Sequence, residues 1–226
     1  DCGLLNINLN TFNTSKFFII TLYNWYLYYI RLCSYFEHSL YLIIKKMKIL
    51  IVPARSGSKR IKNKNIKIMN NKPMLIHSLQ IARETKLFDK IHLSTDSDKY
   101  IEIANSYGFK TDFKREKKLS NDNTPVLDAV RSDLQKFIKL GYKFNEICVL
   151  SATSPLLNSK DLIKTRKIFC KYYKKFPVVS AARYPAKIER GMKIKNGKLK
   201  FINKKNILKK TQTFSESYYP TGNIFY

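Results

Sequence analysis

The residues best suited to chemistry follow a short apolar run and favour the binding of an anion. Ile49–Val52 is followed by Ala54-Arg-Ser-Gly-Ser-Lys-Arg60, which places three cations and two hydroxyls around Gly57. Small residues let backbone N–H groups approach a phosphate chain, while Arg and Lys neutralise its charge. The chain contains neither a Walker A motif nor a dinucleotide-binding glycine motif. Residue types alone leave two interpretations open: a triphosphate or anionic-sugar site, or a solvated basic loop.

Polar segments also follow two other apolar runs. Ser94-Thr-Asp96 ends the run that begins at Lys90, and Ser151–Pro155 follows Ile147–Leu150. If these runs are parallel strands, their carboxyl ends lie at one edge of the sheet, where such folds bind ligands. We therefore expect the three segments to converge.

The spacing of apolar residues predicts alternating strands and helices. One helix, Pro125–Leu140, has an expected apolar face of Val126, Ala129, Val130, Leu134, Phe137 and Ile138. The other predicted helices are Met74–Thr85, Ser97–Tyr107 and Ser159 to about Tyr173. The predicted strands are Ile49–Val52, Lys90–Ser94, Lys110–Phe113, Ile147–Leu150 and Pro177–Ala182, and Asn196-Gly197 predicts a hairpin between Met192–Ile194 and Leu199–Phe201. This order predicts an α/β fold with a mostly parallel sheet covered on both faces.

The composition bears on the partners of the protein and on its redox compartment. The net charge of +27 comes mainly from lysine, and it has two interpretations: a compositional bias, or a surface with an acidic partner. A nucleic-acid-binding protein is the alternative from another class, but the lysines are spread over every predicted helix and no nucleic-acid motif is present. Cys148 and Cys170 lie in apolar runs and are expected to be buried and free, which favours a reducing, cytoplasmic compartment.

Residues 1–46 differ from the rest of the chain. The first methionine is Met47, and the aromatic run Phe17–Ile30 is shorter than the ~20 residues that span a bilayer. We expect residues 1–46 to be upstream translated sequence or a disordered extension, with a membrane anchor as the alternative. Residues 47–226 are expected to form the folded domain.

Several motifs in one order resemble the acylneuraminate cytidylyltransferases, also called CMP-sialic acid synthetases. The resemblance covers nearly all of residues 47–226. The matching segments are Pro53–Ile61, Lys64–Ile66, Asn71–Met74, Leu93–Asp96, Arg115–Asp122 and Thr153–Leu156. It implies a three-layer, Rossmann-like nucleotidyltransferase fold with a small β extension. It also implies transfer of CMP from CTP to the anomeric hydroxyl of a nonulosonic acid, with Mg²⁺ as cofactor, a homodimer, and no nucleic-acid or membrane partner.

The resemblance also assigns residues to the site. Arg55 and Lys59 would act catalytically on the triphosphate, and Asp96 could also bind the metal, with the main metal ligands expected beyond residue 226 in a C-terminally truncated domain. The implied substrate-binding residues are Ser58, Asn65, Ser94, Asp96, Arg115, Ser120, Thr124, Thr153, Ser154, Arg190 and Gln212. The alternative for Asp96, and for Ser120 with Asp122, is capping of the helices that follow them.

Departures from the family pattern bear on the acceptor sugar. Ala152 stands where the sialic acid branch usually has a glutamine, and the pseudaminic acid branch often has an alanine there. Tyr184–Lys193 also resembles a stretch of that branch, with Lys187 in place of a proline. Pseudaminic acid is therefore the favoured acceptor, with N-acetylneuraminic and legionaminic acids as alternatives. Ser56 replaces a common glycine of the first loop.

Overall fold

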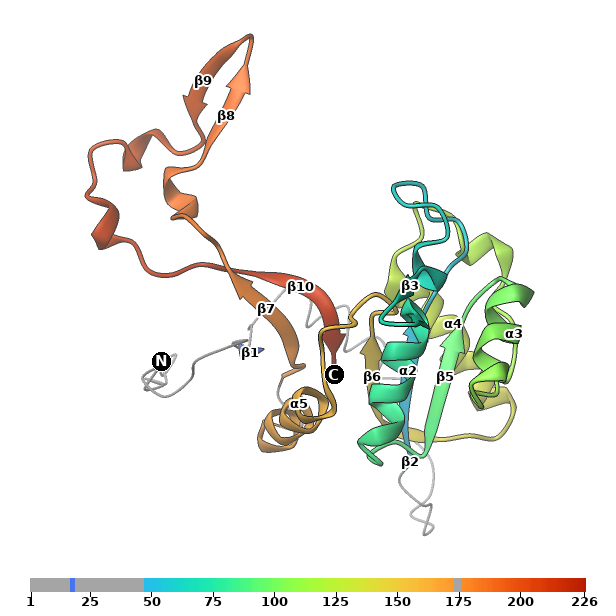
Figure 1. Ribbon diagram of the computed structural model, residues 1–226. Helices are drawn as coiled ribbons and strands as arrows, with labels where there is room; N and C mark the ends of the chain where they lie inside the picture. Colours follow the sequence, from blue (N-terminus) through green and yellow to red (C-terminus); the bar gives the residue numbers. More distant parts are fainter. Residues whose placement is uncertain (1–16, 19–46, 173–175) are drawn as a thin grey trace. The chain divides into compact units, whose positions relative to one another are not determined.

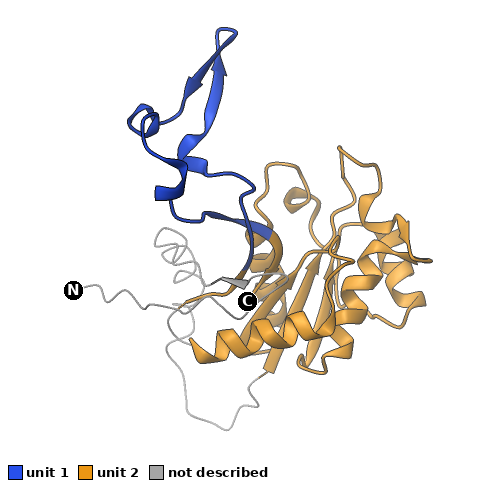
Figure 2. Ribbon diagram, turned by 60° about the vertical axis from the view of Figure 1, so that its left-hand side comes forward, with its two compact units in different colours: residues 1–18, 180–221 blue, residues 19–179, 222–226 orange. Residues whose placement is uncertain are grey.

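The computed structural model describes residues 17–18, 47–172 and 176–226. The chain divides into two compact units, coloured in Figure 2: residues 1–18 and 180–221 form unit 1, and residues 19–179 and 222–226 form unit 2. Apart from the strand β1 (Phe17–Phe18), the prediction for residues 1–46 falls outside the described residues.

The central sheet of the described chain is mostly parallel, with the strand order β1-β7-β10-β6-β2-β5. Its strands β2, β5 and β6 lie in unit 2. β2 (Met47–Pro53) pairs in parallel with β5 (Lys90–Ser94) and β6 (Phe144–Leu150), whereas the end of β10 (Tyr218–Phe225) pairs antiparallel with β6. The residues Ile49–Val52 are fully buried, as expected for a parallel strand covered on both faces. The predicted fold class is confirmed.

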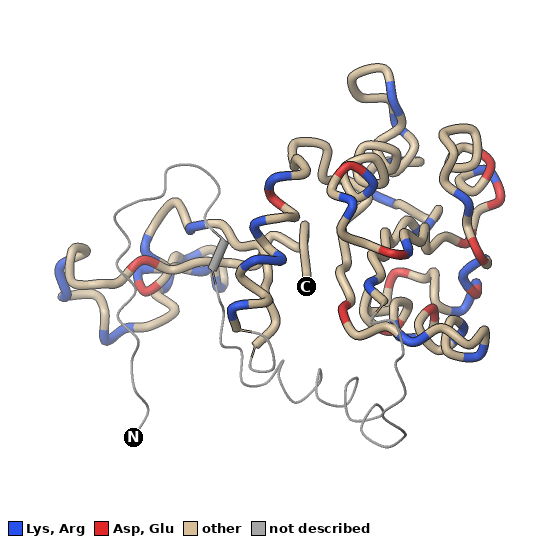
Figure 3. The backbone as a smooth tube through the Cα atoms, turned by 90° about the horizontal axis from the view of Figure 1, so that it is seen from below, with Lys and Arg blue, Asp and Glu red and all other residues tan. Residues whose placement is uncertain are grey.

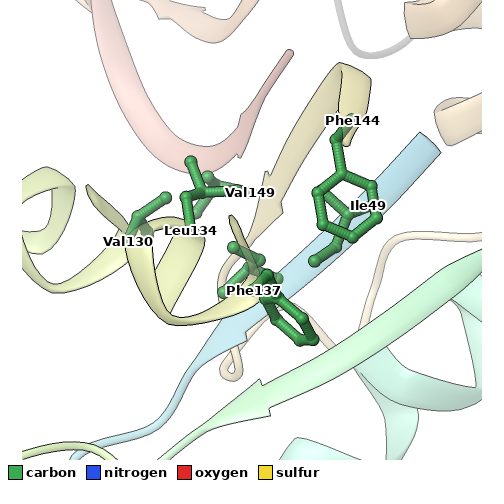
Figure 4. Close-up of a cluster of buried hydrophobic side chains, with 7 residues drawn as sticks. Ile49, Val130, Leu134, Phe137, Phe144 and Val149 are labelled. Atoms are coloured by element: carbon green, nitrogen blue, oxygen red, sulfur yellow. The ribbon is translucent and has the colours of Figure 1, made fainter. Parts of the chain in front are cut away.

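Helices cover both faces of this sheet (Figure 1). On one face, α4 (Val126–Lys139) packs Val130, Leu134 and Phe137 against Ile49 and Ile51 (Figure 4). Because successive strand residues point to opposite faces, the alternate residues of β2 turn toward the second layer. There, α2 (Met74–Glu84) contacts β2, β5 and α5 (Ser159–Lys171). Because β2 pairs in parallel with both β5 and β6, the carboxyl ends of these three strands lie at one edge of the sheet.

Local signals set the ends of the helices. α3 (Asp98–Ser106) begins after Ser97, whose side chain accepts a hydrogen bond from Tyr100 N, and the chain leaves it through Gly108 at φ 76°. α5 begins with a reciprocal capping box between Asn158 and Asp161. These helices lie within one to two residues of their predicted bounds.

Unit 1 contains the predicted hairpin. β8 (Met192–Lys195) pairs antiparallel with β9 (Lys198–Phe201), and the turn residues Asn196 and Gly197 have φ of 53° and 70°. Positive φ at both central residues is the requirement of a type I′ turn, which Asn-Gly meets with little strain. Most of β7 (Val179–Arg183) also belongs to this unit.

Short elements complete the described chain. In unit 2 they are η2 (Lys64–Ile66), β3 (Ile68–Met69), β4 (Lys72–Pro73) and η3 (Lys117–Leu119). In unit 1 they are η4 (Ile188–Arg190), η5 (Lys204–Asn206) and η6 (Thr211–Thr213).

The predicted strand Lys110–Phe113 is wrong, because these residues form no strand. The segment contacts β5 through side chains: Asp112 pairs with Lys90, and the Phe113 ring lies 4.6 Å from the His92 ring. Side-chain contacts replace the backbone ladder that a strand requires.

Three burial predictions are also wrong. Val126 and Ile138 are 56% and 47% exposed, because they lie at the margins of the apolar face of α4. Asp133, which was not expected on that face, is fully buried there. Cys148 is buried as predicted, but Cys170 is exposed on α5.

Candidate functional site

The loop after β2 is tied to the loop after β5. Ala54 N donates to Ser94 O at 2.8 Å, which extends the pairing of the two strands. The Ser56 backbone N–H and hydroxyl then donate to the two carboxylate oxygens of Asp96, each at 2.8 Å. Ser56, which replaces a common glycine of the family, thus makes a contact that glycine could make only in part. Helix capping by Asp96 is wrong, because Ser97 is the cap.

Arg55 and Lys59 converge on one carboxylate. Arg55 Nη2 and Lys59 Nζ each lie 2.6 Å from an oxygen of Asp122. Hydrogen bonds from Lys59 and then Arg55 hold the pKa of Asp122 below its usual range. The Lys59 side chain is 83% exposed, so this pair is open to solvent and to ligands. Two cations that hold one small anionic group can hold a phosphate in the same way.

The remaining predicted nucleotide-binding residues of this region support or face the loop. Asn65 is buried and donates from Nδ2 to Arg55 O at 2.9 Å, and Ser58 N donates to Ser56 O. Opposite, a Cβ placed on Gly57 would lie 4.0 Å from Ser120 O. The Ser120 hydroxyl donates to Glu116 O at 3.3 Å, and the Thr124 backbone N–H donates to Asn121 Oδ1 at 2.9 Å. Capping of α4 by Ser120 or Asp122 is wrong, because α4 follows Pro125 without a side-chain cap.

Arg115 folds onto the end of β5. Its Nε donates to Ser94 Oγ at 2.9 Å and its Nη2 to Ser94 O at 3.0 Å, while its backbone N–H bonds Thr95 O. Arg115 is only 6% exposed, and this burial lowers its pKa. The positive charge of Arg55 lowers it further, whereas Asp133 and Asp96 oppose the shift. The positive charge that Arg115 and Arg55 bring to this sheet edge favours the binding of an anion there.

The loop after β6 is fixed by the last residues of the chain. Ser151 N donates to Asn223 O at 2.8 Å, and the Ser154 hydroxyl donates to Asn223 Oδ1 at 3.0 Å. Thr153 N donates to Ser151 Oγ at 3.3 Å. Thr153 and Ser154 therefore stand at the expected edge, although no contact described here joins them to the loop after β2.

Arg190 and Gln212 lie in unit 1. Arg190 Nη1 donates to Lys209 O at 3.1 Å, and Gln212 is exposed in η6. Unit 1 also contains a cavity of about 350 Å³. It is lined by Arg183, Tyr184, Pro185, Ala186, Lys187, Thr211, Glu216 and Ser217. The cavity includes the beginning of the segment that resembles the pseudaminic acid branch.

Two acidic residues of the site region have roles that their positions in the sequence do not reveal. For Asp122 the sequence offers helix capping only as an alternative, because its partners Arg55 and Lys59 are distant in sequence. Asp133 lies at helical spacing within the apolar stripe of α4, between Ala129 and Phe137. That position was a signal: a carboxylate within an apolar stripe indicates a buried polar contact.

The described residues offer limited ligands for a metal. They contain no group of three or more His, Cys, Asp or Glu side chains that could hold an ion. Mg²⁺ requires only one or two carboxylates when substrate phosphates and water complete its octahedron. Asp96 fits that role, since each of its oxygens accepts one hydrogen bond and a carboxylate oxygen has two lone pairs.

The cytidylyltransferase family profile matches residues 49–219. The chain belongs to the cytidylyltransferase family. It is 31% identical to the pseudaminic acid cytidylyltransferase of Campylobacter jejuni over 79% of this chain and 77% of that protein. It is also 33% identical to the N-acylneuraminate cytidylyltransferase of Escherichia coli, over 60% of this chain and 31% of that protein.

Structural comparison agrees on the fold of this cytidylyltransferase. A CMP:2-keto-3-deoxy-manno-octonic acid synthetase solved with CTP superposes with a TM-score of 0.60, at 15% identity, over 80% of this chain and 74% of that one. Among the residues that the structure describes, every helix is too short or too polar to cross a bilayer.

Proposed function

We propose that this chain transfers CMP from CTP to the anomeric hydroxyl of a nonulosonic acid, releasing pyrophosphate. The observation that carries the proposal is the convergence of Arg55 and Lys59 on a single carboxylate at the carboxyl end of β2, in a chain of the cytidylyltransferase family. Similarity to the pseudaminic acid enzyme over most of the chain supports the substrate class.

Charge neutralisation is the main task of the site. The triphosphate takes the place of the Asp122 carboxylate between Arg55 and Lys59, whose charges offset the negative charge that develops on the pyrophosphate. The sugar hydroxyl forms a new O–P bond at the α-phosphate and loses its proton, while the bond from the α-phosphate to the bridging oxygen breaks. When bound beside Asp96, Mg²⁺ would supply further neutralisation of the triphosphate.

Pseudaminic acid is the acceptor that we favour. Ala152 is 2% exposed and has no side-chain group that could bond a sugar, unlike the glutamine usual in the sialic acid branch. The relatives also include a CMP-N,N′-diacetyllegionaminic acid synthase of Legionella pneumophila, 34% identical over 48% of this chain, so legionaminic acid is the main competitor.

The test offers the protein CTP and Mg²⁺ with pseudaminic, N-acetylneuraminic or legionaminic acid in turn. Pyrophosphate release and the CMP-sugar are measured for each. We expect the highest kcat/KM with pseudaminic acid. Turnover only with another of the three would overturn the choice of acceptor, and failure of the chain to bind CTP would overturn the function.

A homodimer is proposed through the β8–β9 hairpin. Ile194 and Leu199 form a cross-strand pair and are 75% and 67% exposed. Such high exposure is unusual for two adjacent apolar side chains on a protein surface that faces water. A second copy of the chain is the partner that we infer. The cytoplasmic location expected from the cysteines stays a prediction.

Changing this pair is expected to convert a dimer into a monomer. Ile194→Asn with Leu199→Asn removes the apolar contact, and light scattering after size exclusion measures the mass. The matched control, Lys195→Asn with Lys198→Asn, changes the adjacent cross-strand pair, which points to the opposite face. Retention of the dimer by the Ile194/Leu199 variant, or equal dissociation of both variants, would contradict this interface.

The Asp122→Asn variant is expected to bind CTP about two- to fivefold more tightly, because the triphosphate no longer competes with a carboxylate for Arg55 and Lys59. Titration calorimetry with CTP measures the effect, and Asp89→Asn, directly before the amino end of β5, controls for the change of charge. Weaker binding of CTP with Mg²⁺ would instead identify Asp122 as a metal ligand.

The basic surface does not favour a nucleic-acid partner. Figure 3 shows Lys and Arg along all parts of the described chain, interspersed with Asp and Glu, instead of gathered on one element. Weak, strongly salt-dependent binding to unrelated DNA duplexes is the expected behaviour of such a surface.

A further inference from the structure

A single residue holds both oxygens of the Asp96 carboxylate just beyond the carboxyl end of β5. The Ser56 backbone N–H donates to Asp96 Oδ1 and the Ser56 hydroxyl donates to Asp96 Oδ2, each at 2.8 Å. Each oxygen keeps a further lone pair for another ligand. Because both donors belong to one residue, they fix the orientation of the carboxylate relative to the loop after β2. Only the bond to Oδ2 depends on the side chain, so a glycine at position 56 could not donate it.

Asp96 lacks a cationic partner at a sheet edge that is rich in cations. The neighbouring Asp98 pairs with Lys114, and Asp122 is held by two cations of the loop after β2. No ion pair between described residues includes Asp96, although its side chain is only partly exposed. A partly buried charge is costly unless it is paired. A divalent cation bound with the triphosphate would supply that pairing.

We propose that Ser56 is a positioning residue that orients the Asp96 carboxylate toward the metal ion bound to CTP. Mg²⁺ demands near-ideal octahedral coordination, so a single protein carboxylate binds it well only within a narrow range of orientations. Hydrogen bonds to a ligating carboxylate set its orientation, and their loss typically weakens metal binding about 10- to 100-fold. This inference rests on the proposed function and on the fit of Asp96 to Mg²⁺.

The contact between Ser56 and Asp96 could instead serve only to join two loops. Ala54 N already donates to Ser94 O at 2.8 Å, so the start of the loop after β2 is tied to β5 without the Ser56 hydroxyl. The two roles predict different results. A hydroxyl that only shapes the loop affects the binding of CTP equally with and without metal. A hydroxyl that orients a metal ligand affects only the metal-dependent part of the binding.

The experiment uses the full chain with CTP and no acceptor sugar, so that no turnover occurs. Titration calorimetry measures CTP affinity with Mn²⁺ and again with EDTA, and the EPR signal of free Mn²⁺ measures metal binding directly. We expect Ser56→Ala to weaken the binding of Mn²⁺ in the presence of CTP about tenfold and to leave CTP binding in EDTA unchanged.

Three further variants identify the group responsible. Ser56→Thr keeps the hydroxyl and should bind Mn²⁺ like the wild type. In the Asp96→Ala background, Ser56→Ala should have no further effect on metal binding, because the two residues act as one unit. Ser106→Ala is the matched control, since it removes an exposed hydroxyl at the end of α3 that donates to Ile103 O, and it should change neither affinity.

Equal losses of CTP affinity with Mn²⁺ and with EDTA would overturn the proposal, as would wild-type metal binding by Ser56→Ala. If Ser56→Ala does not fold, Ser56→Gly removes the same hydroxyl and must show the same metal-dependent loss. The wild-type chain tests the proposed function separately. If it binds CTP under neither condition, the function is wrong. If it binds CTP but Mn²⁺ does not tighten that binding, only the positioning role is wrong.

Discussion

Replacing Arg55 or Lys59 by alanine is expected to lower kcat/KM for CTP by about 100- to 1,000-fold, the usual cost of removing one charge-stabilising donor from an active site. Both side chains reach a single carboxylate at 2.6 Å, so both can reach a phosphate in the same place. Steady-state pyrophosphate release, with CTP varied at saturating acceptor, measures the loss.

A third variant separates the site from the general charge of the protein. Lys143→Ala removes one positive charge just before β6, at the amino end of the parallel strands. Its activity should stay near wild type at physiological salt, where exposed charges are screened beyond about 8 Å. Equal losses for Lys143 and Lys59 would mean that the loop is only part of a diffuse basic surface. Unchanged activity of both loop variants would place the triphosphate elsewhere.

The sequence predicts the framework of this site well, because the signals are local. The strand Lys90–Ser94 has the predicted bounds, and the Asn196-Gly197 turn forms the predicted hairpin. Each depends on residues within a few positions of one another. The three polar loops were placed at one edge by topology alone, since carboxyl ends of neighbouring parallel strands must meet.

The contacts of the site were less predictable, because they join distant parts of the chain. Asp122 has the residue type and the position of a helix cap, and only folding of the chain brings it to Arg55 and Lys59. Lys110–Phe113 stands where a short strand could follow the preceding helix, but its place in the sequence does not show whether a partner strand is free to pair. The width of the α4 stripe likewise depends on the sheet beneath it, which leaves Ile138 exposed and encloses Asp133.

Glu146→Ala is expected to destabilise unit 2 by about 3–5 kcal/mol, because it removes one partner of a largely buried ion pair. The Glu146 carboxylate accepts from Arg166 Nε and Nη2 at 2.8 and 2.9 Å and from the Tyr226 hydroxyl at 2.8 Å. Tyr226 is fully buried, so the variant leaves a buried hydroxyl and a guanidinium without an acceptor. Urea denaturation at pH 7 measures the loss, and Glu116→Ala, in exposed pairs with Lys118 and Lys136, should change stability little.

The pH dependence of this loss tests its electrostatic origin. Burial alone would raise the pKa of Glu146, but the hydrogen bonds from Arg166 and Tyr226 outweigh it and hold the pKa below the ordinary value of 4.5. A group whose pKa is lowered by folding stabilises the protein above its unfolded pKa, and this contribution disappears as the pH falls through the folded pKa. The difference between wild type and Glu146→Ala should therefore be full at pH 7 and should shrink as the pH falls below about 4.5. A difference that stays constant down to about pH 3 would mean that lost packing, and not the charge of Glu146, accounts for the destabilisation.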